Sequence, residues 1–405
     1  MTKEGKKKKL MLLGGLRYLL PVIEAAHRMG IHVITVDYIP ENIAHKYSDE
    51  YHNVSIIDKE AVLKLAQELE IDGIMSFAVD PGVVTAAYVA EKMGLPFQGP
   101  YESVRILQDK ARFRAFLAEN NFNVPKAKGY DSLEKAMLDK DFFNWPVIVK
   151  PVDSAGSKGV TRVDDPNELK EAVEYALMES HSGNFIIEDF LEKEGHSSDT
   201  DSFTIDGKLV FCSFSDQRFD EKADNPYTPA AYSWPSTMPE DAQQELISEL
   251  QRLMTLLDMK DGIYNIETRL CKNGKPYIME VSPRGGGNRL AEMLEYASRT
   301  SLIDNAVRTA VGLPADTIGM PEYDGHLAEV ILHAETDGIF ERVELSPEMS
   351  DYVIETDLWV NPGDKVAGFS GANNAIGTLV LRFPTEQILE SAMEDIPSWC
   401  RILTV

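Results

Sequence analysis

The chain is 405 residues long and 43% hydrophobic, which is enough for two to four packed units with cores of their own. Its formal net charge of −26 repels nucleic acid and anionic membrane surfaces, so we expect neither as a partner. The three cysteines have no paired spacing, which argues against a disulfide framework or a thiolate metal site and favours a cytoplasmic location.

Short apolar runs alternate with helical patterns through the first hundred residues. The predicted strands cover residues 9–13, 31–37 and 73–77, and the predicted helices cover residues 16–29, 58–69 and 81–93. Such alternation predicts parallel strands joined by crossover helices, so we expect residues 1–100 to form an N-terminal α/β domain. Gly14-Gly15 imitates a dinucleotide-binding loop, but the GxGxxG pattern is not completed and a NAD site is not expected.

The pattern changes in the second part of the chain. A helix is predicted to open at Asp109, followed by strands at residues 147–150 and 160–163, a helix at 165–180 and a strand at 184–189. A polar break is expected at residues 192–200. We predict one subdomain at residues 101–190, with a glycine-rich loop, and a second at residues 191–320.

The second half of the chain contains two predicted hairpins and a separate end. Strands are expected at residues 202–205 and 209–217, a helix at 240–258, and a hairpin of strands 262–270 and 276–281. Residues 321–405 are predicted to form a small β-rich unit, with strands at 326–333, 366–370 and 376–382 and a helix at 385–394. Residues 216–234 are expected to be a loop that determines specificity, and residues 220–239 to form part of a pocket wall.

One segment combines a strand, a lysine and a loop of small residues. The apolar strand 147–151 contains Lys150 near its end, and the loop 153–159 follows with Ser154, Gly156, Ser157 and Gly159. Small residues let main-chain N–H groups approach phosphate oxygens, and the lysine supplies a charge beside them. The alternative is an ordinary glycine- and serine-rich hairpin.

Two further segments place acids at strand ends. The run Glu188-Asp189-Phe190-Leu191 ends an apolar strand, and its backbone could meet a flat adenine while a later acid accepts hydrogen bonds from a ribose. Glu267 and Glu280 lie in the two strands of the second hairpin. If their faces coincide, two carboxylates meet there and suit Mg²⁺. The alternative is a salt bridge to Arg269 or Arg284.

An arginine and three glycines follow Glu280 directly. The sequence Arg284-Gly285-Gly286-Gly287-Asn288 precedes a helix predicted to begin near Arg289, which is typical of an anion site. Arg218, at the end of a predicted strand, could hold a substrate carboxylate or form a surface salt bridge. His333 is expected to be a hydrogen-bonded core histidine.

Taken in order, these segments resemble the ATP-grasp superfamily over residues 101–312. The resemblance implies an ATP-grasp fold of α/β and α+β parts, with ATP and two Mg²⁺ ions, or Mn²⁺, as cofactors. It implies that ATP is bound by the set Lys110, Lys150, Ser154, Gly156, Ser157, Gly159, Glu188, Asp189, Phe190, Leu191 and Glu194, the last as the ribose acid. It further implies metal ligands Glu267, Glu280 and Ser282, catalytic roles for Arg284 and Lys150, and substrate contacts from Arg218, Arg284, Gly286, Gly287 and Asn288.

One departure concerns the second metal. The superfamily commonly has asparagine where this chain has Ser282, a shorter and poorer ligand. Within the superfamily, the chain is most similar to carboxylate–amine and L-amino-acid ligases, which form an amide through an acyl phosphate and release ADP and phosphate. This resemblance implies small-molecule carboxylate and amine substrates, and it is compatible with a homodimer.

Two other functions are compatible with the same segments. One is a bicarbonate- or formate-activating enzyme of the purine-pathway or biotin-carboxylase type. The other is a catalytically silent nucleotide-binding regulator, for which Ser282 is the one favourable feature. Retention of the lysines, both glutamates and Arg284 argues against the silent regulator.

Overall fold

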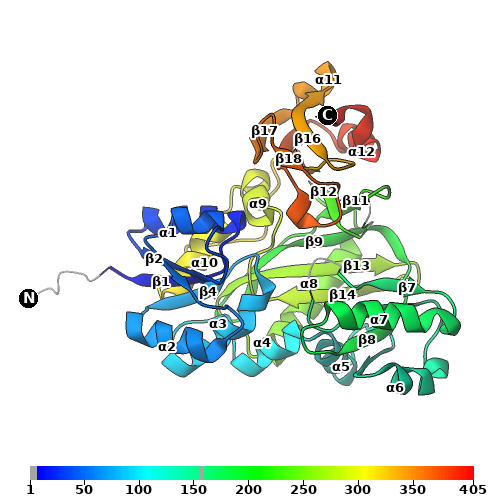
Figure 1. Cartoon of the computed structure of the whole chain (residues 1–405), viewed down its shortest axis with the longest axis horizontal. Helices are drawn as coiled ribbons and strands as arrows, with labels where there is room; N and C mark the ends of the chain where they lie inside the picture. The colour runs from blue at the N-terminus through cyan, green and yellow to red at the C-terminus, as the bar shows by residue number, and fades with distance from the viewer. Residues whose placement is uncertain (1–6, 155–157, 224, 226) are drawn as a thin grey trace, which may run out of the picture.

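The computed structural model describes residues 7–154, 158–223, 225 and 227–405. In Figure 1 the N-terminal unit lies at one end of the molecule, next to a long central sheet, and the C-terminal residues cover part of that sheet. A small sheet with its helices lies at the opposite end, so the central sheet has a different unit at each end.

The N-terminal unit is a four-stranded parallel sheet of order β3-β2-β1-β4, which confirms the predicted parallel arrangement. Its strands are β1 (Lys9–Leu13), β2 (His32–Asp37), β3 (Glu50–Asn53) and β4 (Gly73–Ser76). Its helices are η1 (Arg17–Leu19), α1 (Leu20–Arg28), η2 (Ile43–Lys46), α2 (Lys59–Leu69) and α3 (Asp80–Met93). Apolar side chains on both faces of the sheet are fully buried, which is typical of parallel strands covered by helices.

A second four-stranded sheet forms the small subdomain, with the order β5-β8-β6-β7 and antiparallel pairing. Its strands are β5 (Ala127–Tyr130), β6 (Val147–Pro151), β7 (Thr161–Val163) and β8 (Phe185–Asp189). The helices of this region are α4 (Tyr101–Gln108), α5 (Lys110–Glu119), α6 (Leu133–Leu138), η3 (Lys140–Phe142), η4 (Pro166–Glu168) and α7 (Leu169–Glu179). The carboxylate of Asp109 caps α5 by accepting from the N–H groups of Ala111 and Arg112, both at 3.0 Å, which fixes Lys110 at the helix start.

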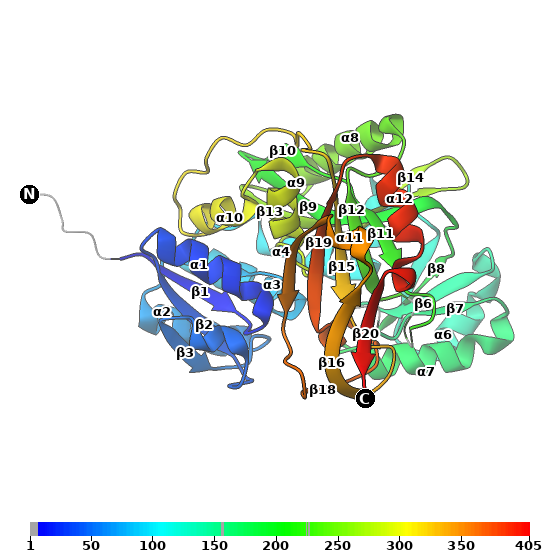
Figure 2. The ribbon, with the colours of Figure 1, turned by 90° about the horizontal axis from the view of Figure 1, so that it is seen from above.

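The central sheet has nine strands in the order β14-β13-β9-β11-β12-β15-β19-β17, with β10 paired to β9. Its bounds are β9 (Lys193–Ile205), β10 (Lys208–Cys212), β11 (Asp216–Phe219), β12 (Pro229–Trp234), β13 (Gly262–Cys271), β14 (Pro276–Ser282), β15 (His326–Leu332), β17 (Val353–Leu358) and β19 (Gly377–Phe383). The helices α8 (Glu240–Leu256), α9 (Leu290–Ser298) and α10 (Leu302–Ala310) pack on it. Figure 2 shows β15, β17 and β19 running beside the strands of the large subdomain.

The remaining C-terminal elements form a three-stranded sheet and several short helices. They are β16 (Gly338–Leu345), α11 (Pro347–Ser350), β18 (Lys365–Val366), η5 (Ala372–Asn374), α12 (Glu386–Glu394), η6 (Ile396–Ser398) and β20 (Cys400–Thr404). The division at residues 320/321 stays a prediction. The central sheet runs across it, because β15 pairs with β12 from Leu327 to Val330.

Three predictions about the central sheet are wrong. Residues 193–205 form the single strand β9 instead of a polar break followed by a strand. The predicted strand 209–217 is two strands, β10 and β11, and the expected loop region 216–234 contains β11 and β12. The polar residues that suggested loops, among them Asp199 and Asp201, are strand residues on a face that carries the candidate site described below.

The C-terminal strands were only partly predicted. β15 and β19 match the expected segments closely, but the segment expected at 366–370 is only the two-residue strand β18. β16, β17 and β20 were not predicted, because their alternating polar and apolar residues are interrupted by charges that suit exposed loops equally well.

Candidate active site

Carboxylates face one another across neighbouring strands of the central sheet. Glu267 on β13 is directly opposite Glu280 on β14 and directly opposite Asp199 on β9. Opposite residues in antiparallel strands share a face, so the three acids form a row. This confirms the prediction that Glu267 and Glu280 meet across the hairpin. The next row along the same strands consists of Asp201, Asn265 and Ser282.

Two lysines approach this face from different elements. Lys110, at the start of α5, places its Nζ 3.5 Å from a Glu280 carboxylate oxygen and donates to the Ser154 carbonyl oxygen at 3.0 Å. Lys150, on β6, donates to Glu188 at 2.5 Å. The structure therefore brings together the two lysines that were predicted to hold ATP phosphates.

Glu188 is the centre of a buried ion-pair network. Its second carboxylate oxygen accepts from Arg114 Nε at 2.9 Å, and Arg114 also donates to the Met279 carbonyl oxygen at 2.8 Å. Burial alone would raise the pKa of Glu188, but Arg114 and Lys150 hold it at about 2. Burial lowers the pKa of Lys150, and Glu188 opposes that shift. The network joins α5, β6 and β8 to β14, and thereby positions Lys150 beside the acidic face.

The loop after β6 is anchored at its described ends. Asp153 accepts from Ser180 Oγ at 2.9 Å and from the Ser182 N–H at 2.7 Å, and the Ser154 hydroxyl donates to the Glu179 carbonyl oxygen. Gly159 has φ of +70°, and a Cβ there would lie 2.9 Å from Pro151 Cγ, so the position requires glycine. Gly156 and Ser157 lie outside the described residues, and their predicted phosphate contacts stay predictions.

The segment predicted to meet adenine follows β8. The N–H groups of Asp189 and Phe190 donate to the carbonyl oxygens of Lys126 and Pro146 at 2.9 and 3.0 Å. The Asp189 carboxylate accepts from Asn144, and the Phe190 ring lies 4.6 Å from the Arg162 guanidinium carbon. These two N–H groups are therefore committed within the protein, and the adenine contact predicted for this segment stays a prediction.

Glu194 and Leu191 flank the start of β9. Glu194 is exposed, so the structure places it at the surface of the strand without fixing it toward a ribose. The Leu191 carbonyl oxygen accepts from Arg269 NH1 at 3.5 Å, and the same arginine places NH2 3.8 Å from Glu267. Arg269 thus connects the predicted adenine segment to the acidic row.

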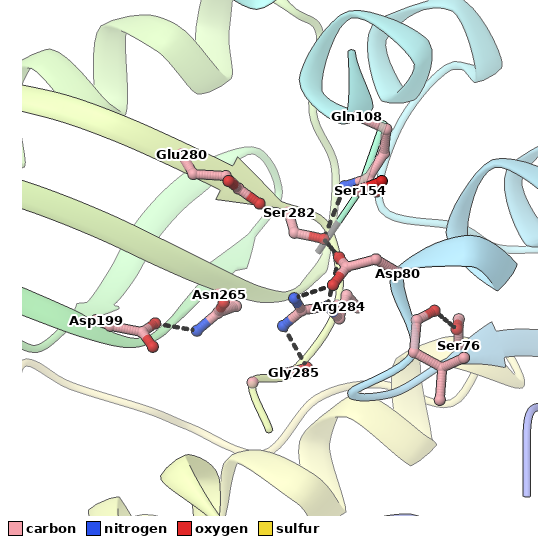
Figure 3. A network of polar contacts seen from close by, with 12 residues as sticks. Ser76, Asp80, Gln108, Ser154, Asp199, Asn265, Glu280, Ser282, Arg284 and Gly285 are labelled. Atoms are coloured by element: carbon pink, nitrogen blue, oxygen red, sulfur yellow. Dashed lines mark hydrogen bonds and ion pairs between the residues drawn. The ribbon is translucent and has the colours of Figure 1, made fainter. Parts of the chain in front are cut away.

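Arg284 holds the N-terminal unit against the site (Figure 3). Its Nε and NH2 donate to the two Asp80 carboxylate oxygens at 2.9 and 2.6 Å, and NH1 donates to the Gly285 carbonyl oxygen at 3.0 Å. Burial would raise the pKa of Asp80, but Arg284 and Ser282 lower it. Three of the five guanidinium hydrogens are used in this way, which leaves two for the predicted contact with a phosphoryl group.

Ser282 belongs to the same network. Its hydroxyl donates to Asp80 at 3.0 Å and accepts from Gln108 Nε2 at 2.8 Å (Figure 3). Metal binding by Ser282 stays a prediction, but its hydroxyl already has two partners. The residue links α3, α4 and β14 at the edge of the acidic face.

The glycines after Arg284 differ in their surroundings. A Cβ on Gly285 would lie 2.2 Å from the Phe77 ring, and one on Gly286 would lie 2.6 Å from Leu290 and 2.9 Å from Asp201. Gly286 donates its N–H to Asp201 at 2.8 Å, whereas a Cβ on Gly287 would meet nothing within 4 Å. Open space therefore borders Gly287, and the substrate contact predicted for this segment stays a prediction.

Asn288 faces the same region from the end of the glycine segment. Its Nδ2 donates to the Tyr232 hydroxyl at 3.1 Å, and its Oδ1 accepts from the Tyr18 hydroxyl at 3.4 Å. Arg218, in contrast, pairs with Glu390 of α12 at 2.6 Å and donates to Ser233 Oγ at 2.6 Å. Its guanidinium is thus occupied by the C-terminal unit, and its predicted role toward a substrate carboxylate stays untested.

Two aspartates on β9 were not among the predicted site residues. Asp199 accepts from Asn265 Nδ2 at 2.8 Å and from the Tyr232 hydroxyl at 3.1 Å. Burial and then Glu267 raise the pKa of Asp199 to about 7, and burial raises that of Asp201 to about 7 as well. Asp201 Oδ2 is buried without a hydrogen-bond partner among the described residues. This face therefore has more negative charge than the surrounding cations compensate.

Comparisons with known proteins agree with this geometry. The sequence matches the family described as ATP-grasp domain over residues 143–292, and the family described as ATP-grasp N-terminal domain over residues 23–97. The chain belongs to the ATP-grasp superfamily. The ATP-grasp match contains Lys150, Glu267 and Glu280, and the N-terminal match contains Asp80.

Relatives of this ATP-grasp protein include enzymes of more than one kind. It is 26% identical over 313 residues to a formate-dependent phosphoribosylglycinamide formyltransferase of Synechococcus sp. (strain WH7803), covering 76% of this chain and 78% of the relative. The fold is similar to an L-amino acid ligase from Bacillus licheniformis, with a TM-score of 0.80, 20% identity and coverage of 99% and 100%. It is also similar to the biotin carboxylase domain of the Hydrogenobacter thermophilus 2-oxoglutarate carboxylase, crystallised with MgADP and bicarbonate, with a TM-score of 0.74, 17% identity and coverage of 99% and 92%.

The acidic row of this ATP-grasp protein suits Mg²⁺ that is shared with a nucleotide. Within the described part of the chain, no three Asp, Glu, His or Cys side chains are arranged to hold a metal ion by themselves. Mg²⁺ is commonly bound by one or two carboxylates that share it with substrate phosphates, and Glu267 and Glu280 provide such a pair. Burial raises the pKa of Glu267, and the negative charge of Glu280 raises it further. A cation between the two carboxylates would therefore relieve their repulsion. None of the helices described in the structure could span a membrane.

The buried Glu188 network predicts a specific loss of stability. Replacing Glu188 with Gln should lower the free energy of unfolding at pH 7 by about 3–5 kcal/mol, because Arg114 and Lys150 lose their counter-charge in a buried site. The folded-state pKa of Glu188 is depressed from 4.5, so its contribution is complete above about pH 4.5. Below that pH the difference between wild type and Glu188→Gln should narrow by about 1.4 kcal/mol per pH unit until about pH 2.

Urea unfolding followed by circular dichroism between pH 7 and pH 3.5 would measure this difference. Glu344→Gln is the matched control, because Glu344 forms an exposed pair with Arg401 at 2.8 Å and its loss should change stability little. A Glu188→Gln protein as stable as the control would show that the network does not hold the subdomains together.

The glycine segment predicts opposite outcomes for adjacent substitutions. Gly286→Ala should destabilise the protein and sharply reduce nucleotide-dependent activity, because the new Cβ would collide with Leu290 and displace Asp201. Gly287→Ala should fold normally, because its Cβ enters open space. Thermal unfolding of the two variants in parallel checks the prediction, and equal melting temperatures would contradict the packing described for Gly286.

Proposed function

We propose that this protein is a Mg²⁺- and ATP-dependent carboxylate–amine ligase that forms an amide bond through an acyl phosphate and releases ADP and phosphate. The observation that carries the proposal is the carboxylate pair Glu267 and Glu280 with Lys110 and Lys150 beside it. Hard oxygen ligands and nearby lysines are what a metal-bound triphosphate requires. A cytoplasmic location and a homodimer belong to the same proposal.

Each residue has a distinct role in the proposed reaction. Lys150, oriented by Glu188, and Lys110 bind phosphate oxygens, while Glu267 and Glu280 would hold Mg²⁺, which would neutralise charge on the transferred phosphoryl group. A substrate carboxylate oxygen attacks the γ-phosphorus, its new P–O bond replaces the bond to ADP, and ADP leaves with the electron pair. The chain's contribution to this step is positioning and electrostatic stabilisation.

The second step joins the amine to the activated carboxyl group. The neutral nitrogen attacks the acyl carbon, the C–N bond forms, and the C–O bond to phosphate breaks as phosphate leaves. The nitrogen gives up a proton, and Asp199, which lies next to Tyr232 and has a pKa of about 7, is suitably placed to accept it. The open space beside Gly287 is where we place the acyl group.

A formate-activating enzyme is the second candidate, and the sequence similarity to formate-dependent formyltransferases favours it. Such an enzyme would activate formate in the same way but transfer the formyl group to phosphoribosylglycinamide. The surplus of acids around Asp199 and Asp201 argues against an anionic, phosphate-bearing amine, because like charges would meet in a buried site. We therefore place this candidate second.

The test measures ADP and phosphate release with Mg²⁺-ATP against a matrix of carboxylates and amines, with amino acids foremost. We expect release only when a particular acid and a particular amine are both present. Lys150→Ala should reduce this rate by at least two orders of magnitude, because the phosphates lose a charge that Glu188 holds in place.

Lys128→Ala is the matched control, since Lys128 lies on the same small sheet and pairs with Asp139 at the surface. Normal turnover by Lys150→Ala would refute the assigned phosphate site. Release stimulated by formate or bicarbonate alone would favour the second candidate. Binding of ATP without turnover on any pair would support a silent regulator.

A further inference from the structure

A fully buried glutamate without a partner lies beyond the proposed reaction site. Glu329, in the middle of β15, has 0% exposure, and neither of its carboxylate oxygens meets a hydrogen-bond donor among the described residues. Buried carboxylates are normally paired or hydrogen-bonded, because leaving water without compensation is costly. The side chain therefore requires a separate explanation.

The surroundings of Glu329 are acidic. Arg289 lies nearby at the start of α9, but its guanidinium contacts Glu355 at 2.5 Å, Glu292 at 3.1 Å and Thr378 Oγ1 at 2.8 Å. Asp357 is a further 4.0 Å neighbour of the same arginine. One arginine is thus shared among three carboxylates before Glu329 is counted. The described residues of this cluster therefore have more carboxylates than cations.

A second arginine, Arg17, contacts an aromatic ring and forms no ion pair with these acids among the described residues. The guanidinium of Arg17 lies over the Trp359 ring at 5.5 Å, and the Tyr18 ring contacts the same tryptophan edge-on at 6.2 Å. Among the described residues, these acids do not form a group that could hold a metal ion. The missing charge is therefore better supplied by an organic cation, which aromatic rings such as Tyr18 and Trp359 also attract.

Glu329 is one strand away from the proposed site of amide formation. It is directly opposite Tyr232 on β12, so both side chains lie on the same face of the sheet. The Tyr232 hydroxyl contacts Asp199 at 3.1 Å and Asn288 at 3.1 Å. Neighbouring strands are about 5 Å apart, so Glu329 lies only one strand from Tyr232 and the Asn288 side chain that Tyr232 contacts.

We propose that Glu329 binds a second, cationic group of the amine substrate, which makes that substrate a diamine or a basic amino acid. This inference rests on the proposed ligase function and specifies its amine. The nitrogen that pairs with Glu329 is protonated and has no free electron pair, so it cannot attack the acyl phosphate. The attacking nitrogen must be a different one, located near Asp199 and Asn288. A substrate with two nitrogens satisfies both positions.

Equilibrium binding to the full-length protein tests the proposal. Calorimetric titrations would compare 1,4-diaminobutane with 1-aminobutane, and L-lysine with L-norleucine, with and without a non-hydrolysable Mg²⁺-ATP analogue. At least one member with two amino groups should bind ten times more tightly than its partner with one. Glu329→Gln should remove this preference and leave the affinity for the ATP analogue unchanged.

The variant is expected to fold, because Gln has the shape of Glu and removes an uncompensated buried charge. Glu344→Gln, an exposed substitution on β16, is the matched control and should keep the preference. Should Glu329→Gln fail to fold, the wild-type comparison of each pair still decides. Equal affinities within both pairs, an unchanged preference in Glu329→Gln, or no amine binding at all would each overturn the proposal. Mg²⁺ binding that Glu329→Gln abolishes would overturn it in favour of a metal site.

The same titrations separate this inference from the proposed function. Release of ADP with amines that have one amino group, without any preference for a second, would leave the ligase intact and remove the inferred subsite. Glu329-dependent binding of 1,4-diaminobutane or L-lysine without ADP formation on any carboxylate would retain the subsite and refute the ligase.

Discussion

Acidic side chains gather on one half-buried face of the central sheet, and the rest of the site is arranged around the compensation of their charge. The row Asp199, Glu267 and Glu280 spans three adjacent strands, where pairing places acids directly opposite one another. In a low-dielectric setting such contacts are unfavourable unless cations lie close by. Among the described residues, the cations within 4 Å are Lys110, which comes from the separate helix α5, and Arg269, which lies on β13 itself. The packing of α5 against the central sheet therefore also brings a compensating positive charge to the acidic row.

The network at Arg284 shows how this couples distant parts of the chain. Asp80, at the start of α3 in the N-terminal unit, neutralises Arg284, and Ser282 and Gln108 complete its hydrogen bonds. At the other end, Glu188 draws Arg114 and Lys150 together from separate elements. Because each pair is buried, each subdomain is held in a defined orientation toward the acidic face. The site thus depends on contacts that join residues far apart in the sequence.

Features that depend only on residues close together in the sequence could be predicted from it. Lys150 at the end of an apolar strand and the hairpin that pairs Glu267 with Glu280 are properties of short segments, and the structure has them as predicted. Arg114 and Asp80 were missed because their partners lie 74 and 204 residues away. A signal existed for Asp80, since it follows a parallel strand at the sheet edge where sites commonly form.

The missed residues of β9 and β15 have a different cause. Asp199 and Asp201 alternate with Thr200 as a strand would, but polar residues at strand spacing are also common in loops. Only the pairing of β9 with β13 shows that both face the site. Glu329 lies in an apolar run whose period predicts a strand, and the sequence alone cannot show that its carboxylate lacks a partner.

The direction of each pKa shift separates two kinds of buried acid in this protein. Arginine lowers the pKa of Glu188 and Asp80, and these residues hold the units together. Burial raises the pKa of Asp199, Asp201, Glu267 and Glu329, because their cations are lacking or shared. An acid that is already compensated has little to gain from a ligand, whereas an uncompensated acid gains most from a positive one. The second set runs across the sheet from the proposed metal pair to Glu329. In our proposal a metal-bound nucleotide binds at one end of this set and a cationic amine binds at the other.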